Sequence, residues 1–387
     1  MQVTCPHCSA TLEVPDEYAG QMGECSMCNG NVPIPKIATV KMKPVATSNE
    51  PTDPMAQYQL GARYYKGDGV PRDINKAVYW FRKSAEQGFA LAQNKLAQRY
   101  TRGEGVPKDL AEAVRWFRRA AEQGYVSAQH DLGLCYAEGI GTPKNPAEAV
   151  KWYMFAAKQG HPGAQNKLGQ CYARGIGVPE NPTEAVKWFH RAAEDGYAPA
   201  QYAMGYCYDN GAGVVQDHAK AVKWYLKAAR QGDAASQYTL GQCYYSGIGV
   251  DQDYSEAVMW HARAAEQGHV GAQLALGVCY FSGEGVEQDY EQATVWYSKA
   301  AEKGNADAQF MLGLCYAAGA GVPEDLDEAV DWFQKSAAQG NADAQYYLGT
   351  YCQQGLGVEM DLEQARGWYE LAAEQGHEEA LAALESL

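Results

Sequence analysis

The sequence predicts an all-α protein: a solenoid of nine 36-residue helix pairs, preceded by a small cysteine-rich module of β type. An Ala-Gln dipeptide, replaced once by Ser-Gln, recurs every 36 residues from Ala56, and nine copies fill residues 56–379 before a partial tenth from Ala380. A fixed period of this length is typical of stacked repeats in which each unit contacts only its neighbours. All nine tryptophans share one position in these copies: Trp80, Trp116, Trp152, Trp188, Trp224, Trp260, Trp296, Trp332 and Trp368.

The first helix of each repeat is expected to begin near its Ala-Gln dipeptide. Leucine, cysteine and tyrosine follow at the fifth, eighth and ninth positions, as in Leu240, Cys243 and Tyr244, and this spacing makes one apolar helix face. A Gly-x-Gly sequence, such as Gly247 to Gly249, then ends the helix, because glycine tolerates the left-handed backbone of a helix C-cap.

The second helix is expected to begin after an Asp or Asn N-cap. Pro146 and Pro182 stand at the first helical position, which favours proline. Alanines flank an aromatic residue on the buried stripe, as in Ala185, Phe189 and Ala193. A glutamate three residues after the cap predicts reciprocal capping boxes at four pairs: Asp109 and Glu112, Asn145 and Glu148, Asn181 and Glu184, and Asp325 and Glu328.

The stretch EAVKWFHRAAEDGYAPAQYAMGYCYDNGAGV and its copies resemble the Sel-one-like repeat (SLR), a relative of the tetratricopeptide repeat (TPR). The resemblance covers most of the chain. It implies antiparallel helix pairs stacked into a right-handed superhelix that serves as a scaffold or adaptor for other proteins, and the tryptophans are then expected to be packing residues.

The repeat cysteines are expected to be unpaired, buried thiols. Equivalent positions in stacked helices lie roughly 8–10 Å apart, whereas a disulfide needs Cα atoms within about 7 Å. Some secreted SLR proteins bridge two cysteines in each repeat, and one such group is linked to penicillin binding and β-lactam hydrolysis. A β-lactam- or peptidoglycan-related hydrolase is therefore the alternative function, although this chain has at most one cysteine in each repeat: Cys135, Cys171, Cys207, Cys243, Cys279, Cys315 and Cys352.

The N-terminal module, residues 1–35, carries Cys5, Cys8, Cys25 and Cys28 as two C-x-x-C pairs sixteen residues apart. Four thiolates at this spacing predict a structural zinc ion, and so short a segment needs such a staple to fold. The module resembles the zinc ribbons at the N-termini of many bacterial proteins. A redox C-x-x-C is the alternative, but it lacks a βαβ setting. Residues 36–54 are expected to be a flexible linker before the solenoid, residues 55–387.

Composition argues against several classes of function. The net charge is −15 and residues 1–35 contain no Lys or Arg, which disfavours nucleic acid and anionic membranes. No apolar run is long enough to cross a bilayer and no secretory signal precedes the module, so we expect a soluble, cytoplasmic protein. No catalytic motif is present, which predicts a protein that is not an enzyme.

His161, His269 and His377 share one position after the second helix, where we expect a polar residue merely to be tolerated.

A partner-binding face is expected in the C-terminal half. Residues 56–127 carry 13 basic and seven acidic side chains, whereas residues 236–387 carry five basic and 24 acidic ones. In the resembling TPR family, the third, seventh and tenth positions of the first helix line the peptide groove. In this chain, the residues at these positions predict a groove for a basic peptide with apolar anchors. The alternative is that these residues pack between repeats. The charge gradient also permits head-to-tail self-association. The face consists of Tyr202, Tyr206, Tyr238, Tyr245, Leu274, Val278, Phe281, Phe310, Leu314 and Tyr346.

Overall fold

The structure, a computed structural model, describes residues 2–4, 11–13, 22–24, 31–33 and 50–387. The chain divides into two compact units, Met1–Asp53 and Pro54–Leu387, and each is described by itself.

The first unit contains two antiparallel β-hairpins with the same layout. Strand β1 (Gln2–Thr4) pairs with β2 (Thr11–Glu13), and Thr4 lies opposite Thr11 at the closed end. Strand β3 (Met22–Glu24) pairs with β4 (Asn31–Pro33), and Glu24 lies opposite Asn31. Each hairpin therefore closes over six residues.

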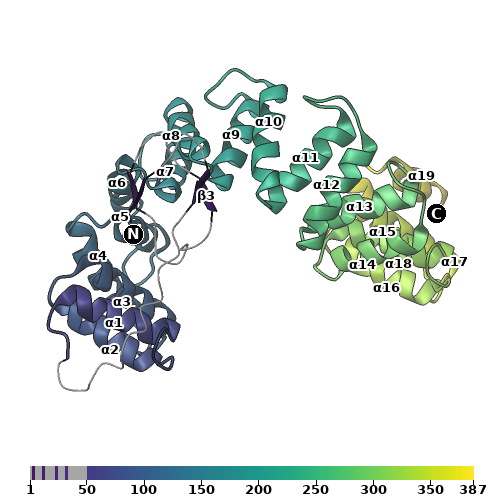
Figure 1. Cartoon of the computed structure of the whole chain (residues 1–387). Coiled ribbons are helices and arrows are strands. Elements are labelled where there is room, and N and C mark those ends of the chain that lie inside the picture. Colours follow the sequence, from purple (N-terminus) through teal and green to yellow (C-terminus); the bar gives the residue numbers. More distant parts are fainter. Residues whose placement is uncertain (1, 5–10, 14–21, 25–30, 34–49) are drawn as a thin grey trace. The chain divides into compact units, whose positions relative to one another are not determined.

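The second unit is all-helical and consists of nine helix pairs and a final helix, each packed against the helices before and after it in the chain (Figure 1). This confirms the predicted class and period. The first helices of the pairs are α1 (Pro54–Lys66), α3 (Ala90–Arg102), α5 (Val126–Glu138), α7 (Pro162–Arg174), α9 (Ala198–Asn210), α11 (Ala234–Ser246), α13 (Val270–Ser282), α15 (Ala306–Ala318) and α17 (Ala342–Gln354). The second helices are α2 (Ile74–Glu86), α4 (Leu110–Glu122), α6 (Pro146–Lys158), α8 (Pro182–Glu194), α10 (His218–Arg230), α12 (Tyr254–Glu266), α14 (Tyr290–Ala301), α16 (Leu326–Ala337) and α18 (Leu362–Glu374), and α19 (Glu378–Ser386) ends the chain.

The second helices begin at the predicted N-caps, but the predicted capping boxes are wrong. The Asp109 carboxylate accepts a hydrogen bond from the Glu112 backbone N–H, as expected. The backbone N–H of Asp109, however, donates to the Tyr100 carbonyl of the preceding helix instead of to Glu112. The Glu112 side chain pairs with Arg115 on its own helix. The backbone N–H groups of Asn145, Asn181 and Asp325 likewise donate to a tyrosine carbonyl of the preceding helix. These N–H groups are therefore not available to the glutamate side chains of the predicted boxes.

The buried residues of the core recur with the same 36-residue period as the sequence. In the first helices from α3 to α17 the fifth-position Leu or Met is fully buried. In all of the first helices except α3, which has Ala97 at this position, the ring of the following second helix packs across a glycine of the first helix. A Cβ at Gly169 would lie 2.5 Å from the Phe189 ring, so this glycine is needed for close packing. The ninth-position tyrosines, such as Tyr244, are only half-buried, so the apolar face is narrower than predicted.

The seven repeat cysteines are buried and free, as predicted. Burial raises the pKa of the Cys135, Cys207, Cys243 and Cys279 thiols to about 11. These thiols are therefore protonated at neutral pH and act as small apolar packing groups.

A ladder of buried glutamine side chains connects the repeats, and it was not predicted. The second residue of each repeat is a glutamine, and in the second to ninth repeats its Nε2 donates to a carbonyl of the preceding helix, as Gln237 does to Ala229 at 3.1 Å. In seven repeats the Oε1 of this glutamine accepts from a glutamine thirty residues later, as Gln237 does from Gln267 at 2.7 Å. Seven such pairs occur: Gln57 with Gln87, Gln93 with Gln123, Gln129 with Gln159, Gln201 with Gln231, Gln237 with Gln267, Gln309 with Gln339, and Gln345 with Gln375.

Among the described residues, no helix is both long and apolar enough to cross a membrane.

Candidate partner-binding face

The ten residues predicted to form the partner-binding face lie on the first helices of five consecutive repeats, α9 to α17. We refer to them as the aromatic face. Tyr206 is exposed, and the other nine side chains are half-buried. None is fully buried, so the face combines packing against the repeat core with an accessible surface. The alternative drawn from the sequence, packing, therefore accounts for the buried part of these side chains, and the groove stays a prediction.

Three histidines pack beside this face or its equivalents. The Tyr238 ring stacks on His269 with centroids 4.6 Å apart, and the Tyr346 ring stacks on His377 at 4.8 Å. His161 stacks in the same way on His130. The expectation that a polar residue is merely tolerated here was wrong, because each histidine is the N-cap of the helix that follows it, α7, α13 or α19.

In each case Nδ1 accepts a backbone hydrogen bond, from Ala164, Ala272 or Ala380. A histidine that accepts at Nδ1 carries its proton on Nε2. At His377 that nitrogen lies 3.2 Å from the Asp343 carboxylate. The cap hydrogen bonds of His269 and His377 thus fix the rings that stack on Tyr238 and Tyr346.

Carboxylates adjoin the aromatic rings of the face. The Tyr245 hydroxyl donates to Glu284 of the next repeat at 2.6 Å, and this bond raises the pKa of Tyr245 to about 12. Beside Tyr346, the side chains of Asp343 and Glu379 are 62% and 70% exposed. Acidic oxygen atoms therefore lie beside the rings of Tyr245 and Tyr346, and they are accessible beside Tyr346.

The equivalent positions of the N-terminal repeats differ. Asn94 and Asn166 are almost fully buried and their Oδ1 atoms have no hydrogen-bond partner among the described residues. Their polarity therefore does not mark an open polar surface. The first repeat has aromatic residues instead, Tyr58 and Tyr65, and the Arg99 guanidinium lies 4.5 Å from the Tyr65 ring centroid.

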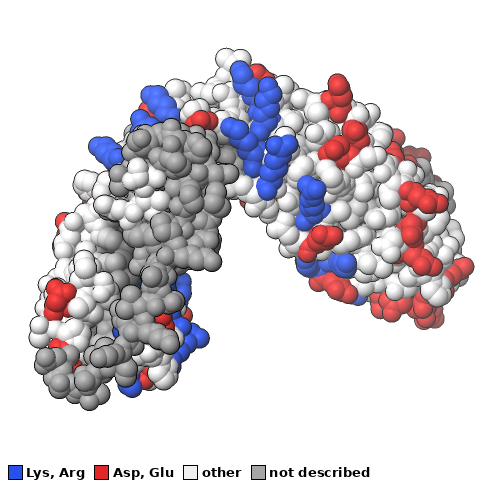
Figure 2. All heavy atoms as spheres, in the orientation of Figure 1, with Lys and Arg blue, Asp and Glu red and all other residues white. Residues whose placement is uncertain are grey.

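The acidic end of the charge gradient is visible on one face of the solenoid (Figure 2). Figure 2 shows acidic side chains spread over the repeats from α12 to α19, whereas Lys and Arg gather over α10. The aromatic face overlaps the acidic repeats, in which residues 236–387 carry five basic and 24 acidic side chains.

The tryptophans are packing residues, as predicted. Five of the nine are buried, and in seven repeats a Lys or Arg three residues later lies over the ring, as Lys227 does 3.9 Å above Trp224. These cation–π pairs cover one face of each ring.

The predicted zinc ligands Cys5, Cys8, Cys25 and Cys28 lie outside the described residues. Within the part of the chain that the structure describes, no group of three His, Cys, Asp or Glu side chains is placed to hold a metal ion.

Solved structures of similar fold support the helical assignment. The chain is 37% identical to a protective antigen of uropathogenic Escherichia coli that displays an SLR fold, with a TM-score of 0.66 over 86% of this chain and 79% of that one. It is 35% identical to a Sel1 repeat protein from Oxalobacter formigenes, with a TM-score of 0.60 over 90% and 97% of the two chains.

A signal transduction ATPase with a tetratricopeptide repeat sensor from Pyrococcus horikoshii shares the fold alone, at 13% identity and a TM-score of 0.52 over 89% of this chain and 55% of that one. No curated protein matches the chain. The Sel1 repeat matches nine consecutive segments that together span residues 54–377. With this match over most of its length, the chain belongs to the Sel1 repeat family.

Proposed function

We propose that this protein is a non-enzymatic scaffold that binds a basic peptide or helix with apolar side chains on its aromatic face. Sel1 repeat proteins generally act as protein-interaction scaffolds. The observation that carries the proposal is the pairing of half-buried rings with accessible carboxylates, as at Tyr346, Asp343 and Glu379. Such rings supply contact area at little cost in conformational entropy, and the carboxylates attract cationic side chains.

Peptide selection on the intact protein tests this proposal. We expect selected peptides to be rich in Lys and Arg, with aromatic or aliphatic residues between them, and to bind more weakly as salt concentration rises. Tyr206→Ala should weaken binding by about tenfold, a loss of about 1–2 kcal/mol, because Tyr206 is exposed and contributes little to the core. Fluorescence anisotropy with the selected peptides measures the loss.

Tyr79→Ala is the matched control, since Tyr79 is similarly exposed but lies on a second helix, α2. Equal losses in both variants, or selection of acidic peptides, would contradict the proposal. A second copy of the chain could supply basic residues from its N-terminal repeats. Sedimentation at low and high salt distinguishes this case, because head-to-tail association gives oligomers that dissociate in salt.

We also propose that the N-terminal unit holds one structural zinc ion through Cys5, Cys8, Cys25 and Cys28. The two hairpins support this assignment because each one closes over six residues that include one C-x-x-C pair in the sequence. Both pairs directly follow the first strand of their hairpin, which matches the repeated layout of a four-thiolate shell. When bound, the zinc ion supplies the folding free energy that so small a unit lacks.

Removing the metal should unfold the N-terminal unit and leave the solenoid intact. We expect one zinc ion per purified chain by elemental analysis, and its loss in Cys25→Ser but not in Cys243→Ser, a buried repeat cysteine. Chelation should abolish the hairpin signals in NMR spectra while helical circular dichroism stays unchanged. Metal-free protein with unchanged hairpin signals would disprove the zinc assignment and leave the partner-binding proposal intact.

A further inference from the structure

The glutamine ladder is interrupted at two of its nine positions. Thirty residues after Gln165 stands Asp195, and thirty residues after Gln273 stands Lys303, in place of the glutamine found in the other seven repeats. Gln165 and Gln273 are both 4% exposed, and their Oε1 atoms lack a hydrogen-bond partner among the described residues. A buried acceptor without a donor is costly, so each gap is a place where an external donor gains free energy.

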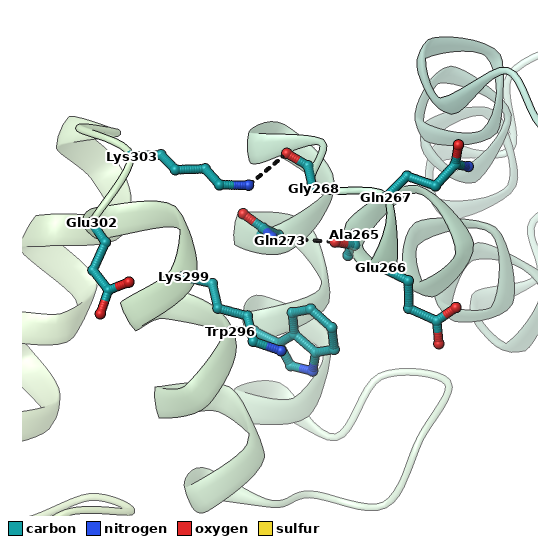
Figure 3. Close-up of a pocket in the computed structure, with 9 residues that line it drawn as sticks. All are labelled: Ala265, Glu266, Gln267, Gly268, Gln273, Trp296, Lys299, Glu302 and Lys303. Atoms are coloured by element: carbon teal, nitrogen blue, oxygen red, sulfur yellow. Dashed lines mark hydrogen bonds between the residues drawn. The ribbon is translucent and has the colours of Figure 1, made fainter. Parts of the chain in front are cut away.

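The gap at Gln273 opens into a pocket of about 470 Å³ between α12, α13 and α14. Figure 3 shows the Gln273 side chain held by its Nε2, which donates to the Ala265 carbonyl at 3.2 Å, while Oε1 points into the space between Lys299 and Lys303. The Lys303 ammonium does not take the place of the missing glutamine, since it donates to the Gly268 carbonyl at 2.8 Å. The floor is Trp296, with the Lys299 ammonium 3.7 Å from the ring centroid.

The intact repeats show which group fills this position. The Gln267 amide donates one hydrogen to Gln237 Oε1 at 2.7 Å and a second to the Arg263 carbonyl at 3.3 Å, one turn back on its own helix. At the gap the equivalent pair of acceptors is Gln273 Oε1 and the carbonyl of Lys299. Two N–H hydrogens on one nitrogen atom satisfy both.

We propose that the pocket at Gln273 binds a primary carboxamide. Its –NH₂ group donates to Gln273 Oε1 and to the Lys299 carbonyl, and its carbonyl oxygen accepts from the ammonium of Lys299 or Lys303. A carboxylate has no hydrogen to give Gln273 Oε1, and an ammonium ion would lie between two lysines. A carboxamide meets both requirements, as the ladder glutamine does in the intact repeats. Its source is either an Asn or Gln side chain of a protein or a small free amide.

Fluorine NMR of the full chain labelled with 5-fluorotryptophan tests the site, with the Trp296 resonance assigned by its loss in Trp296→Phe. Propionamide should shift this resonance saturably, with a Kd on the order of millimolar, as expected for so small a ligand. N,N-dimethylpropionamide and propionate should bind at least about tenfold more weakly, because they lack the two donated hydrogens.

Lys303→Gln should abolish the response, since the new side chain completes the ladder and occupies the pocket. Asp195→Gln completes the ladder at the other gap and should leave the response unchanged. Tighter binding of N-acetylglutamine methylamide than of propionamide identifies a protein side chain as the source, and the reverse order identifies a free amide. The proposal is overturned by no saturable shift, as for a site that only binds water, by an equal response to the dimethyl amide, or by a response that persists in Lys303→Gln.

Discussion

Replacing His261 by phenylalanine is expected to stabilise the solenoid, and more strongly at pH 5 than at pH 8. His261 occupies the buried aromatic position of α12, where other repeats have Phe189 or Phe333. It is completely buried, and neither ring nitrogen has a hydrogen-bond partner among the described residues. A phenylalanine ring fits against the facing glycine in those other repeats, so the substitution removes two unsatisfied polar atoms without a new clash.

The pH dependence follows from the pKa of His261, which burial, with a smaller contribution from the nearby His269, lowers from 6.5 to about 4. Between these two values the unfolded chain binds a proton that the folded chain does not. Stability is therefore lost as pH falls from 6.5 towards 4, by about 1.4 kcal/mol per pH unit. His261→Phe should gain about 1–2 kcal/mol at pH 8 and about 2 kcal/mol more at pH 5.

Urea unfolding of both proteins at pH 5 and pH 8 measures this difference. His190→Gln is the control, because the His190 side chain is 52% exposed, in contrast to the fully buried His261. An NMR titration of the His261 ring should give a pKa well below 6.5. An equal gain at both pH values, or an ordinary pKa at His261, would show that the ring is hydrated in the native state.

The repeat architecture could be predicted because each of the nine repeats carries the same local sequence signals for its helices and turns. The period, the glycine C-caps, the Asp and Asn N-caps and the alanine–aromatic stripe all appear in the sequence as fixed spacings, and the structure confirms them. The unpaired state of the repeat cysteines follows from helix-packing distances, and the structure confirms it.

The contacts between repeats could not be read from single-helix patterns. The capping boxes failed because a carbonyl such as that of Tyr100, nine residues earlier, competes successfully for the N-cap N–H. The role of His377 as a cap stacked on Tyr346 depends on two helices at once. The glutamine ladder does have a sequence signal, the recurrence of glutamines thirty residues apart, and its exceptions at Asp195 and Lys303 could have been found there.

Replacing Gly213 by alanine should destabilise the solenoid much more than the same change at Gly232. Both glycines have positive φ angles, +76° and +90°, so alanine pays a similar backbone cost of about 1–2 kcal/mol at either site. A Cβ at Gly232 meets nothing within 4 Å, whereas one at Gly213 would lie 2.3 Å from the carbonyl oxygen of Pro182. That atom belongs to the first turn of α8 in the preceding repeat, so the backbone must shift there.

Because the clash is with backbone, it cannot be relieved by a rotamer change, and we expect about 2 kcal/mol of additional destabilisation in Gly213→Ala. Because each repeat contacts only its neighbours, the loss of stability should be confined to the repeats around Gly213. Hydrogen exchange should accelerate in α8, α9 and α10 of Gly213→Ala, with little change in α15 to α19, while urea unfolding gives the total loss. Equal losses in the two variants would mean that the loop after α9 moves freely away from α8, and that the second glycine of each Gly-x-Gly sequence serves the turn and not the contact between repeats.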